Sequence, residues 1–208
     1  MKKVFLCLTL AAAISACKNK TTPATETADT VAIKTTETPV ADTTFNIDAI
    51  AVSDKDLGTF PFLAPPPTYS YNYHQEADPK DIKAVDKEYM AVNGKLIAQE
   101  GKTFKINIER PREGDKKFDA AEVQKYYEDK ILSLGGVQVN NVEITKAEYE
   151  RVGEKELITN NYGSTLDPNL LDRIKTYVIK TKDKVVWIQL CLLNEESGHI
   201  AVLEQKVG

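Results

Sequence analysis

The amino-acid sequence predicts an α+β fold: antiparallel sheet with one main helix and a three-stranded meander at the C-terminal end. Three observations support this prediction. Residues 102–109 and 185–194 carry strand patterns, and residues 119–134 carry a helix pattern. The elements follow one another as strands, helix, strand, short helices and strands. That order is typical of α+β domains, because a parallel α/β sheet would alternate strand and helix throughout.

The first strands are expected on either side of a tight turn. Asn93-Gly94 is a dipeptide suited to a two-residue hairpin, and it lies between Lys87–Asn93 and Lys95–Gln99. The next segment, Lys102–Glu109, alternates apolar and polar side chains with the period of a half-buried strand. Its apolar face consists of Phe104, Ile106 and Ile108.

The main helix is predicted over residues 119–134. Asp119 and Glu122 have the spacing of a capping box, and Gly135-Gly136 is typical of a helix end. Between them, apolar side chains recur at helical spacing: Val123, Tyr126, Tyr127, Ile131 and Leu134.

Shorter elements are expected after this helix. Val137–Ile144 has the pattern of a strand, and Thr145 is a candidate first residue of a shorter helix. Leu157–Thr165 is polar and predicts a loop, and a helical turn is expected from Asp167 to about Ile174.

The meander is predicted from three segments near the C-terminus: Thr176–Thr181, Val185–Asn194 and His199–Lys206. The middle segment carries apolar side chains on both faces. That pattern favours a central strand of the sheet, covered on both sides.

Residues 1–16 have the composition of a secretory signal. Lys2 and Lys3 form a positive end, and the following apolar run of 11 residues is too short to cross a bilayer, which needs about 20. The run ends in Ile14-Ser15-Ala16-Cys17, which resembles the lipobox of bacterial lipoproteins: an aliphatic residue and two small ones before a cysteine. A plain signal peptide, cut after a small residue, is the alternative.

The resemblance to a lipobox implies a membrane anchor and a cellular location. Cleavage before Cys17 would leave this residue with a diacylglycerol on sulfur and an acyl chain such as palmitate on nitrogen, and so anchor the protein in a membrane. Lys18 stands where some enterobacterial lipoproteins carry the aspartate of inner-membrane retention. We therefore expect a cell-envelope protein of the outer membrane, facing the periplasm or the cell surface.

The sequence thus predicts three parts: a signal peptide at residues 1–16, a lipidated cysteine with a tether at 17–44, and one α+β domain at 45–208. Residues 18–44 include ten threonines among 27 residues and no aromatic side chain. Such a segment has too little apolar surface to offset the entropy of ordering it, which predicts a disordered tether.

The charge argues against a nucleic-acid partner. Without residues 1–16, 25 basic residues face 31 acidic ones, for a net charge of −6. A mildly acidic chain lacks the basic footprint that binds phosphate backbones. It also lacks attraction to anionic lipid, so membrane contact is expected through the lipid on Cys17 alone.

The sequence carries none of the usual catalytic and cofactor motifs: the glycine-rich nucleotide loops, GxSxG, HExxH or a CxxC pair. His74 and His199 are the only histidines, and both are predicted to be solvated. Cys191 is predicted to be a buried, inert thiol because it lies in an apolar run. We therefore predict no cofactor, no metal site and no catalytic residue.

Two groups of acidic residues are candidates for metal or catalytic sites. Asp54, Asp56 and Gly58 are spaced like the start of a calcium loop, but a third ligand is missing and Pro65 stands in place of the closing glutamate. A second group alternates with basic residues, which is typical of a solvated face. Its acids are Glu143, Glu148, Glu150, Glu154 and Glu156.

The candidate partner-binding residues are Tyr69, Tyr71 and Tyr73, which follow Pro65-Pro66-Pro67. If the chain continues as a strand, the three rings point the same way and form an aromatic surface for an envelope protein or a glycan. The favoured alternative is that they pack this segment onto the sheet.

The domain also resembles the α+β region that precedes the OmpA-like peptidoglycan-binding domain in some outer-membrane proteins. The residues that carry this resemblance are Lys102–Arg110, Asp119–Leu134 with Gly135-Gly136-Val137, and Val185–Gln205. The residues of an OmpA-like domain do not follow in this sequence, so no peptidoglycan-binding residue is carried across.

Three functions remain open on the sequence. The leading hypothesis is a lipid-anchored, non-catalytic binding or assembly module of the cell envelope. The second is an envelope hydrolase with acidic catalytic residues, which a cleft with two carboxylates of separated pKa would support. The third is an inhibitor of an envelope enzyme, with a projecting loop such as Thr59–His74.

Overall fold

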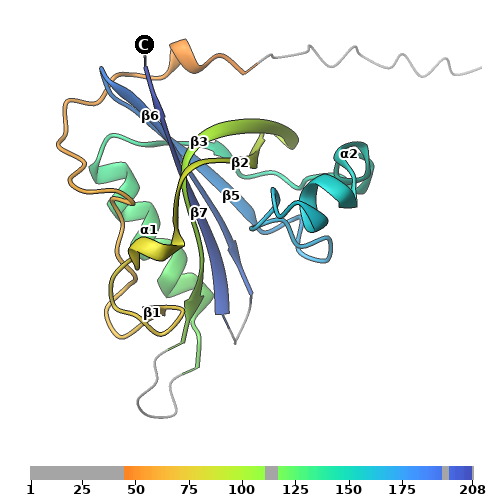
Figure 1. Cartoon of the computed structure of the whole chain (residues 1–208), viewed down its shortest axis with the longest axis horizontal. Coiled ribbons are helices and arrows are strands. Elements are labelled where there is room, and N and C mark those ends of the chain that lie inside the picture. Colours follow the sequence, from red (N-terminus) through yellow and green to blue (C-terminus); the bar gives the residue numbers. More distant parts are fainter. Residues whose placement is uncertain (1–44, 111–116, 194–196, 208) are drawn as a thin grey trace, which may run out of the picture. The chain divides into compact units, whose positions relative to one another are not determined.

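A computed structural model describes residues 45–110, 117–193 and 197–207 (Figure 1). The predicted signal peptide, Cys17 and the tether up to residue 44 lie outside the described residues. In the described part no helix is long and apolar enough to cross a membrane.

The described residues form an α+β structure around one antiparallel sheet of seven strands, so the predicted class is confirmed. The strand order is β1-β3-β7-β6-β5-β4, and β2 pairs with β3. Strand β6 lies between β5 and β7 and is buried along nearly its whole length, as predicted for a central strand. The strands are β1 (Ser70–Tyr71), β2 (Ile82–Val92), β3 (Lys95–Glu109), β4 (Val137–Asn140), β5 (Ile174–Lys180), β6 (Lys184–Leu192) and β7 (Ser197–Lys206).

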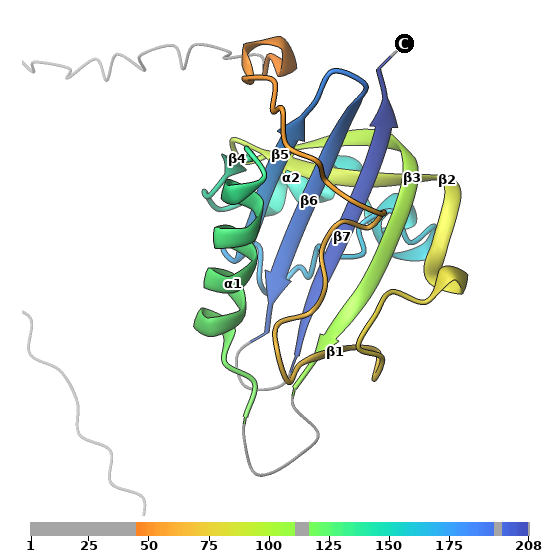
Figure 2. The ribbon, with the colours of Figure 1, turned by 90° about the vertical axis from the view of Figure 1, so that its left-hand side faces the viewer.

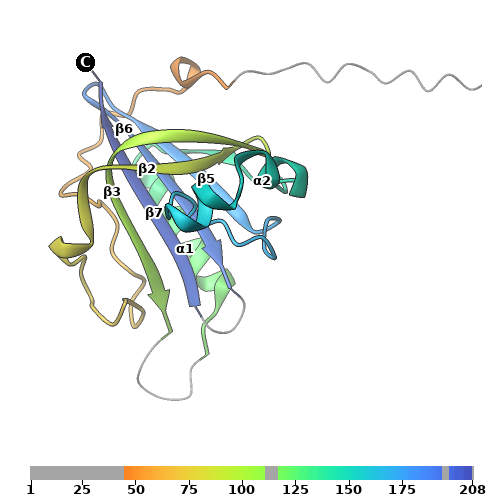
Figure 3. The ribbon, with the colours of Figure 1, turned by 45° about the vertical axis from the view of Figure 1, so that its right-hand side comes forward.

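The predicted hairpin at Asn93-Gly94 is confirmed, with φ of 47° and 77° at the two turn residues. The two strand segments expected after this turn form one strand, β3. Its first half pairs with β2, and its second half, from Lys102 onward, also pairs with β7. The distal part of the β2–β3 hairpin therefore leaves the sheet and arches across β5, β6 and β7 (Figure 3).

Gly101 lies where β3 leaves β7. A Cβ atom at this position would collide with the backbone oxygen of Glu204 on β7. Only glycine permits so close an approach of two backbones. The bend of β3, and with it the position of the whole hairpin, thus depends on the absence of a side chain.

Helix α1 (Ala120–Ser133) forms where a helix was predicted over residues 119–134, and it covers the other face of the sheet (Figure 2). Asp119 is its N-cap and accepts hydrogen bonds from the amides of Ala121 and Glu122. Helix α2 (Lys146–Val152) begins after the predicted cap, Thr145. Two short 3-10 helices, Ile47–Ala49 and Pro79–Asp81, complete the regular elements before β2.

Three predictions between α1 and β5 need correction. The expected loop contains a π-helix, Lys155–Thr159. The helical turn expected from Asp167 is absent: the Asp167 carboxylate accepts the amide of Asn169 (2.8 Å) in a tight turn, and β5 begins at Ile174. Strand β4 ends early, at Asn140, because this side chain is hydrogen-bonded to Gly94 and to Ile174.

The apolar core has layers on both sides of the sheet. On one side, α1 and an N-terminal segment pack against the sheet, and Figure 2 shows this segment running past α1 over the strands. Its buried side chains are Leu57, Phe60 and Leu63. On the other side the hairpin and α2 cover two smaller clusters, one around Cys191 and one around Trp187.

Gln189 connects these layers. Its side chain, wholly buried on β6, accepts hydrogen bonds from the amide of Ala91 (2.6 Å) and the hydroxyl of Thr176 (2.8 Å). Its NH₂ group donates to the carbonyl of Tyr89 (3.0 Å) and to Thr165 (2.6 Å). One amide therefore satisfies backbone groups of the hairpin that no neighbouring strand reaches.

Replacement of Gln189 by leucine is expected to lower the free energy of unfolding by about 2–4 kcal/mol, because buried groups of β2 lose their partner. Urea unfolding followed by the fluorescence of Trp187, the only tryptophan, measures this. Gln138→Leu on the exposed edge strand β4 is the control, with a change of about 0.5 kcal/mol or less. Equal losses in the two variants would contradict the role given to Gln189.

Gly101→Ala is expected to destabilise the protein by about 2 kcal/mol or more, because β3 and β7 must separate to admit the methyl group. Ala98→Ser, an exposed position on the same strand, is expected to cost little. Thermal unfolding of both variants measures the difference. A wild-type midpoint for Gly101→Ala would show that the bend does not depend on this close approach.

Candidate functional site

The tyrosine segment is the first candidate site. Tyr69 and Tyr71 are buried, whereas Tyr73 is 60% exposed. The condition for the three rings to point the same way, a chain that continues as a strand, is not met, because β1 ends at Tyr71. There, Tyr71 and His74 exchange two backbone hydrogen bonds of 2.7 Å across the Asn72-Tyr73 turn.

Tyr69 attaches this segment to the start of α1. Its hydroxyl accepts the amide of Asp119 (3.2 Å) and donates to the carboxylate of Glu122 (3.0 Å). These are the two groups that a capping box would join directly, so the phenol bridges them. The ring also packs edge-on against Phe118, with centroids 5.6 Å apart.

Tyr71 is fixed in the same core. Its hydroxyl donates to the carbonyl of Leu63 (3.3 Å) and accepts a hydrogen bond from Tyr127 of α1 (2.9 Å). Burial raises the pKa of both Tyr71 and Tyr127, so both phenols stay neutral at physiological pH. Packing on the sheet therefore describes Tyr69 and Tyr71, and Tyr73 stays on the surface.

The second candidate is a cluster of carboxylates that the sequence did not single out. The ammonium group of Lys105 on β3 lies 2.9 Å from Asp86 and 2.8 Å from Glu88, both on β2. It also donates to the carbonyls of Lys87 (2.8 Å) and Asn161 (3.0 Å). The side chains of Lys105, Asp86 and Glu88 are 9%, 10% and 1% exposed.

The two carboxylates differ in pKa. Burial raises the pKa of Glu88, although Lys105 opposes it. Burial also acts to raise the pKa of Asp86, but hydrogen bonds from Lys105 and Lys83 outweigh it and lower that pKa. Separated pKa values are typical of acid–base pairs in hydrolases. Here both acids lie against one lysine, and Glu88 also accepts the amide and hydroxyl of Ser164, both at 2.7 Å.

This arrangement links the hairpin to residues 160–164 and leaves Glu88 out of reach of a solvent-borne substrate. It was hidden in the sequence because Asp86 and Glu88 alternate along β2 with Val85, Lys87 and Tyr89, which are exposed or half-buried, and because Lys105 lies on another strand. Only the bend of β3 brings the three side chains together.

Glu148 corrects the predicted solvated face. It is buried, and its carboxylate accepts the amide of Leu96 (2.7 Å) and two hydrogen bonds from Arg151 (2.8 and 2.9 Å). The hydrogen bonds from Arg151 lower the pKa of Glu148 despite its burial. Of the same group, Glu156 forms an ion pair with Lys87 beside the rings of Tyr89 and Tyr162.

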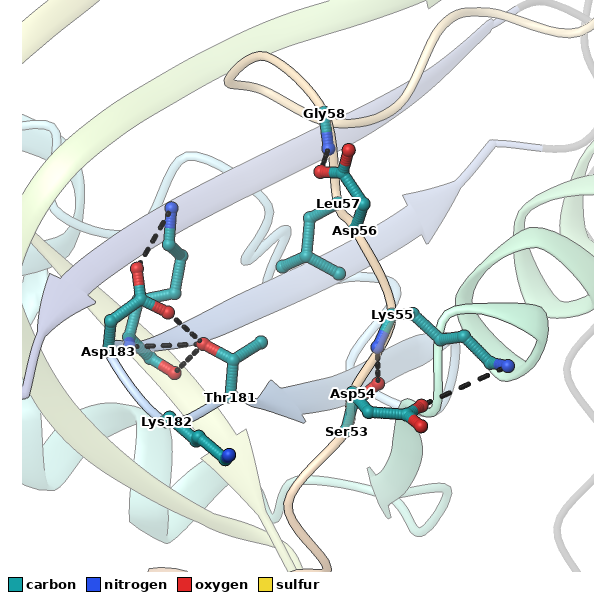
Figure 4. Close-up of a pocket in the computed structure, with 10 residues that line it drawn as sticks. Ser53, Asp54, Lys55, Asp56, Leu57, Gly58, Thr181, Lys182 and Asp183 are labelled. Atoms are coloured by element: carbon teal, nitrogen blue, oxygen red, sulfur yellow. Dashed lines mark hydrogen bonds and ion pairs between the residues drawn. The ribbon is translucent and has the colours of Figure 1, made fainter.

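A hollow of about 320 Å³ separates Ser53–Gly58 from the β5–β6 turn, Thr181–Lys184 (Figure 4). In it, Asp56 accepts the amide of Gly58 (2.9 Å), and Asp54 lies 3.9 Å from Lys55. Figure 4 shows these two carboxylates pointing away from each other. Among the described residues no three His, Cys, Asp or Glu side chains converge on a metal position.

The remaining reactive side chains among the described residues are one thiol and two imidazoles. Cys191 is buried, as predicted, and burial raises the pKa of its thiol to about 11. His199 was expected at a solvated turn; it lies within β7, partly buried, and its burial lowers the pKa of the imidazole. His74 is exposed beside Tyr73.

No known family model and no curated protein matches this chain.

Lys105→Met is expected to lower the free energy of unfolding at pH 7 by about 3–5 kcal/mol, because two buried carboxylates lose their cation. Burial raises the pKa of Glu88 in the folded state. The folded protein therefore binds a proton at Glu88 more readily than the unfolded chain does, and the free energy of unfolding falls as the pH rises through this range. Without Lys105, protonation of Glu88 removes an unpaired buried charge. The loss of unfolding free energy in Lys105→Met is therefore expected to become smaller as the pH falls from 7 to 5.

The control for Lys105→Met is Lys125→Met, which removes an exposed ion pair with Asp129 on α1. It is expected to leave the free energy of unfolding nearly unchanged at every pH, because an ion pair between exposed side chains contributes little. Urea titrations at several pH values measure both variants. A loss for Lys105→Met that does not change with pH would contradict the proposed coupling to Glu88.

Proposed function

We propose that the protein is a lipid-anchored, non-catalytic binding or assembly module of the cell envelope, held by lipid on Cys17. The observation that carries the proposal is the order of segments in the sequence: an apolar run after Lys2 and Lys3, the lipobox-like Ile14-Ser15-Ala16-Cys17, a threonine-rich polar segment and a folded domain. In this proposal the domain is built on one main helix and a C-terminal three-stranded meander.

The tether supports capture of a partner. As a flexible coil, 27 residues span about 30 Å on average and at most about 90–95 Å when extended. Two or three acyl chains hold a protein durably at a membrane, which one chain does not. A domain held in this way meets envelope components at a high local concentration. An outer-membrane location, facing the periplasm or the cell surface, fits Lys18 after the cysteine.

An envelope hydrolase is the alternative that a specific observation favours, namely the separated pKa values of Asp86 and Glu88. Burial of both side chains against Lys105 argues for a structural role instead. An inhibitor of an envelope enzyme is a further alternative, since Thr59–His74 ends in an exposed turn. A binding module and an inhibitor would each bind a protein or glycan partner, whereas a hydrolase would convert a substrate into products.

Cys17→Ala is expected to abolish incorporation of an alkyne-labelled fatty acid and to move the protein from the membrane to the soluble fraction. Cys7→Ala is the matched control, because this cysteine lies in the apolar run and not in the lipobox. It is expected to leave both readouts unchanged. Labelling of the Cys17→Ala variant, or a soluble wild type, would contradict the anchor.

A further inference from the structure

Residues 45–52, called the strap below, are the first described residues of the domain, and they are weakly built into the fold. The strap contains the first 3-10 helix, and every one of its residues is exposed or half-buried. The hydrogen bonds of this helix close within the strap: the amide of Ala49 donates to Asn46 (3.1 Å) and that of Ile50 to Ile47 (3.2 Å). So little burial offsets only a small part of the entropy that the chain loses when it is ordered.

The strap covers the apolar cluster around Trp187. The strands of the hairpin and of the sheet supply the other buried members of this cluster: Met90, Val92, Val178, Val185 and Leu203. Phe45, Ile47 and Ile50 of the strap pack against it, and the ring centroids of Phe45 and Trp187 lie 5.6 Å apart. Trp187 is only 2% exposed, although the three strap side chains over the cluster are half-buried. The strap therefore closes a space whose other walls are strands.

Lys180, the last residue of β5, ties the strap to the sheet. Its ammonium group donates to the carbonyl of Ile47 (3.3 Å) and lies 3.0 Å from the carboxylate of Asp48. Figures 1 and 2 both show the 3-10 helix of the strap beside the end of the sheet at which β5 ends. The Asp48 side chain is 83% exposed, and ion pairs with so exposed a partner contribute little to stability.

The chain is held firmly at Ser53, directly after the strap. The Ser53 amide donates to the carbonyl of Lys180 (2.7 Å), and its hydroxyl donates to the carbonyl of Leu134 (2.7 Å) at the end of α1. A Cβ atom at Gly135 would lie 2.6 Å from the Ser53 hydroxyl oxygen, so this residue fits closely against the end of the helix. The weakly held strap thus ends at a fixed point.

We propose that residues 45–52 are a detachable strap, which opens about Ser53 while the sheet stays folded and thereby uncovers Trp187. Segments with few buried contacts open locally at a lower free energy than the core does. This inference goes beyond the proposed binding function and does not depend on a lipid at Cys17. In an anchored protein, the strap would be the first part of the domain that a pull on the preceding residues reaches.

The test measures the exposure of Trp187, the only tryptophan, by acrylamide quenching of its fluorescence in the full-length chain. Ile47→Ala weakens the strap. Ile97→Ala is the matched control, because Ile97 is also half-buried and packs against the same cluster but belongs to β3. Far-ultraviolet circular dichroism in urea follows the unfolding of the sheet in both variants. Failure of the lipid anchor would leave all these readouts unchanged.

Ile47→Ala is expected to raise the quenching constant about threefold or more and to leave the urea midpoint of the sheet unchanged, because the strap is already open when the sheet unfolds. Ile97→Ala is expected to lower that midpoint and to leave the quenching constant nearly unchanged. In the wild type, the amides of Ala49 and Ile50 are expected to exchange hydrogen about a hundredfold faster than those of β6, at rates that dilute urea does not change.

Three outcomes would each overturn the proposal. Exchange of the Ala49 and Ile50 amides at the rate of β6 would show that the strap opens only when the whole fold does. A midpoint that falls as far in Ile47→Ala as in Ile97→Ala would make the strap an integral part of the core. An unchanged quenching constant in Ile47→Ala would show that the strap does not shield Trp187.

Discussion

The fold depends on one strand that belongs to two layers. Strand β3 pairs with β2 from Lys95 to Phe104, and it pairs with β7 only from Lys102 onward. The part of the β2–β3 hairpin before Lys102 therefore leaves the sheet at Gly101. Once it has left, the edge groups of β2 and β3 find no neighbouring strand. Buried amides and carbonyls without partners would cost more than the apolar contacts gain, so side chains must replace the strand.

Three polar side chains from three elements form hydrogen bonds with these backbone groups of the hairpin. Asn140 accepts the amide of Gly94, Glu148 accepts the amide of Leu96, and Gln189 binds Ala91 and Tyr89. Each would look out of place in a core judged by hydrophobicity alone. Together they fix the hairpin over the sheet and close edges to which another chain could otherwise add a strand. These three polar side chains are therefore buried because β3 bends away from β7 at Gly101.

The sequence predicted what short-range periodicity determines. The α+β class, the Asn93-Gly94 hairpin, the caps Asp119 and Thr145 and the central β6 all follow from patterns within about fifteen residues. The bend of β3 does not, because Gly101 is required by Glu204, which is 103 positions away. The buried state of Glu148 and the Lys105 cluster were missed for the same reason: their partners are neighbours only after the hairpin has crossed the sheet.

The tyrosine segment shows where a pattern argument ends. Alternation of Tyr69, Tyr71 and Tyr73 predicts one common face only if the backbone stays extended, and positive φ at Asn72 and Tyr73 ends the strand after two residues. Because of that turn the three tyrosines differ in burial: Tyr69 and Tyr71 lie in the core, and Tyr73 is largely exposed. The spacing of aromatic residues therefore predicts a shared face only where the backbone stays extended, and the backbone angles after Tyr71 decide which of the three rings join the core.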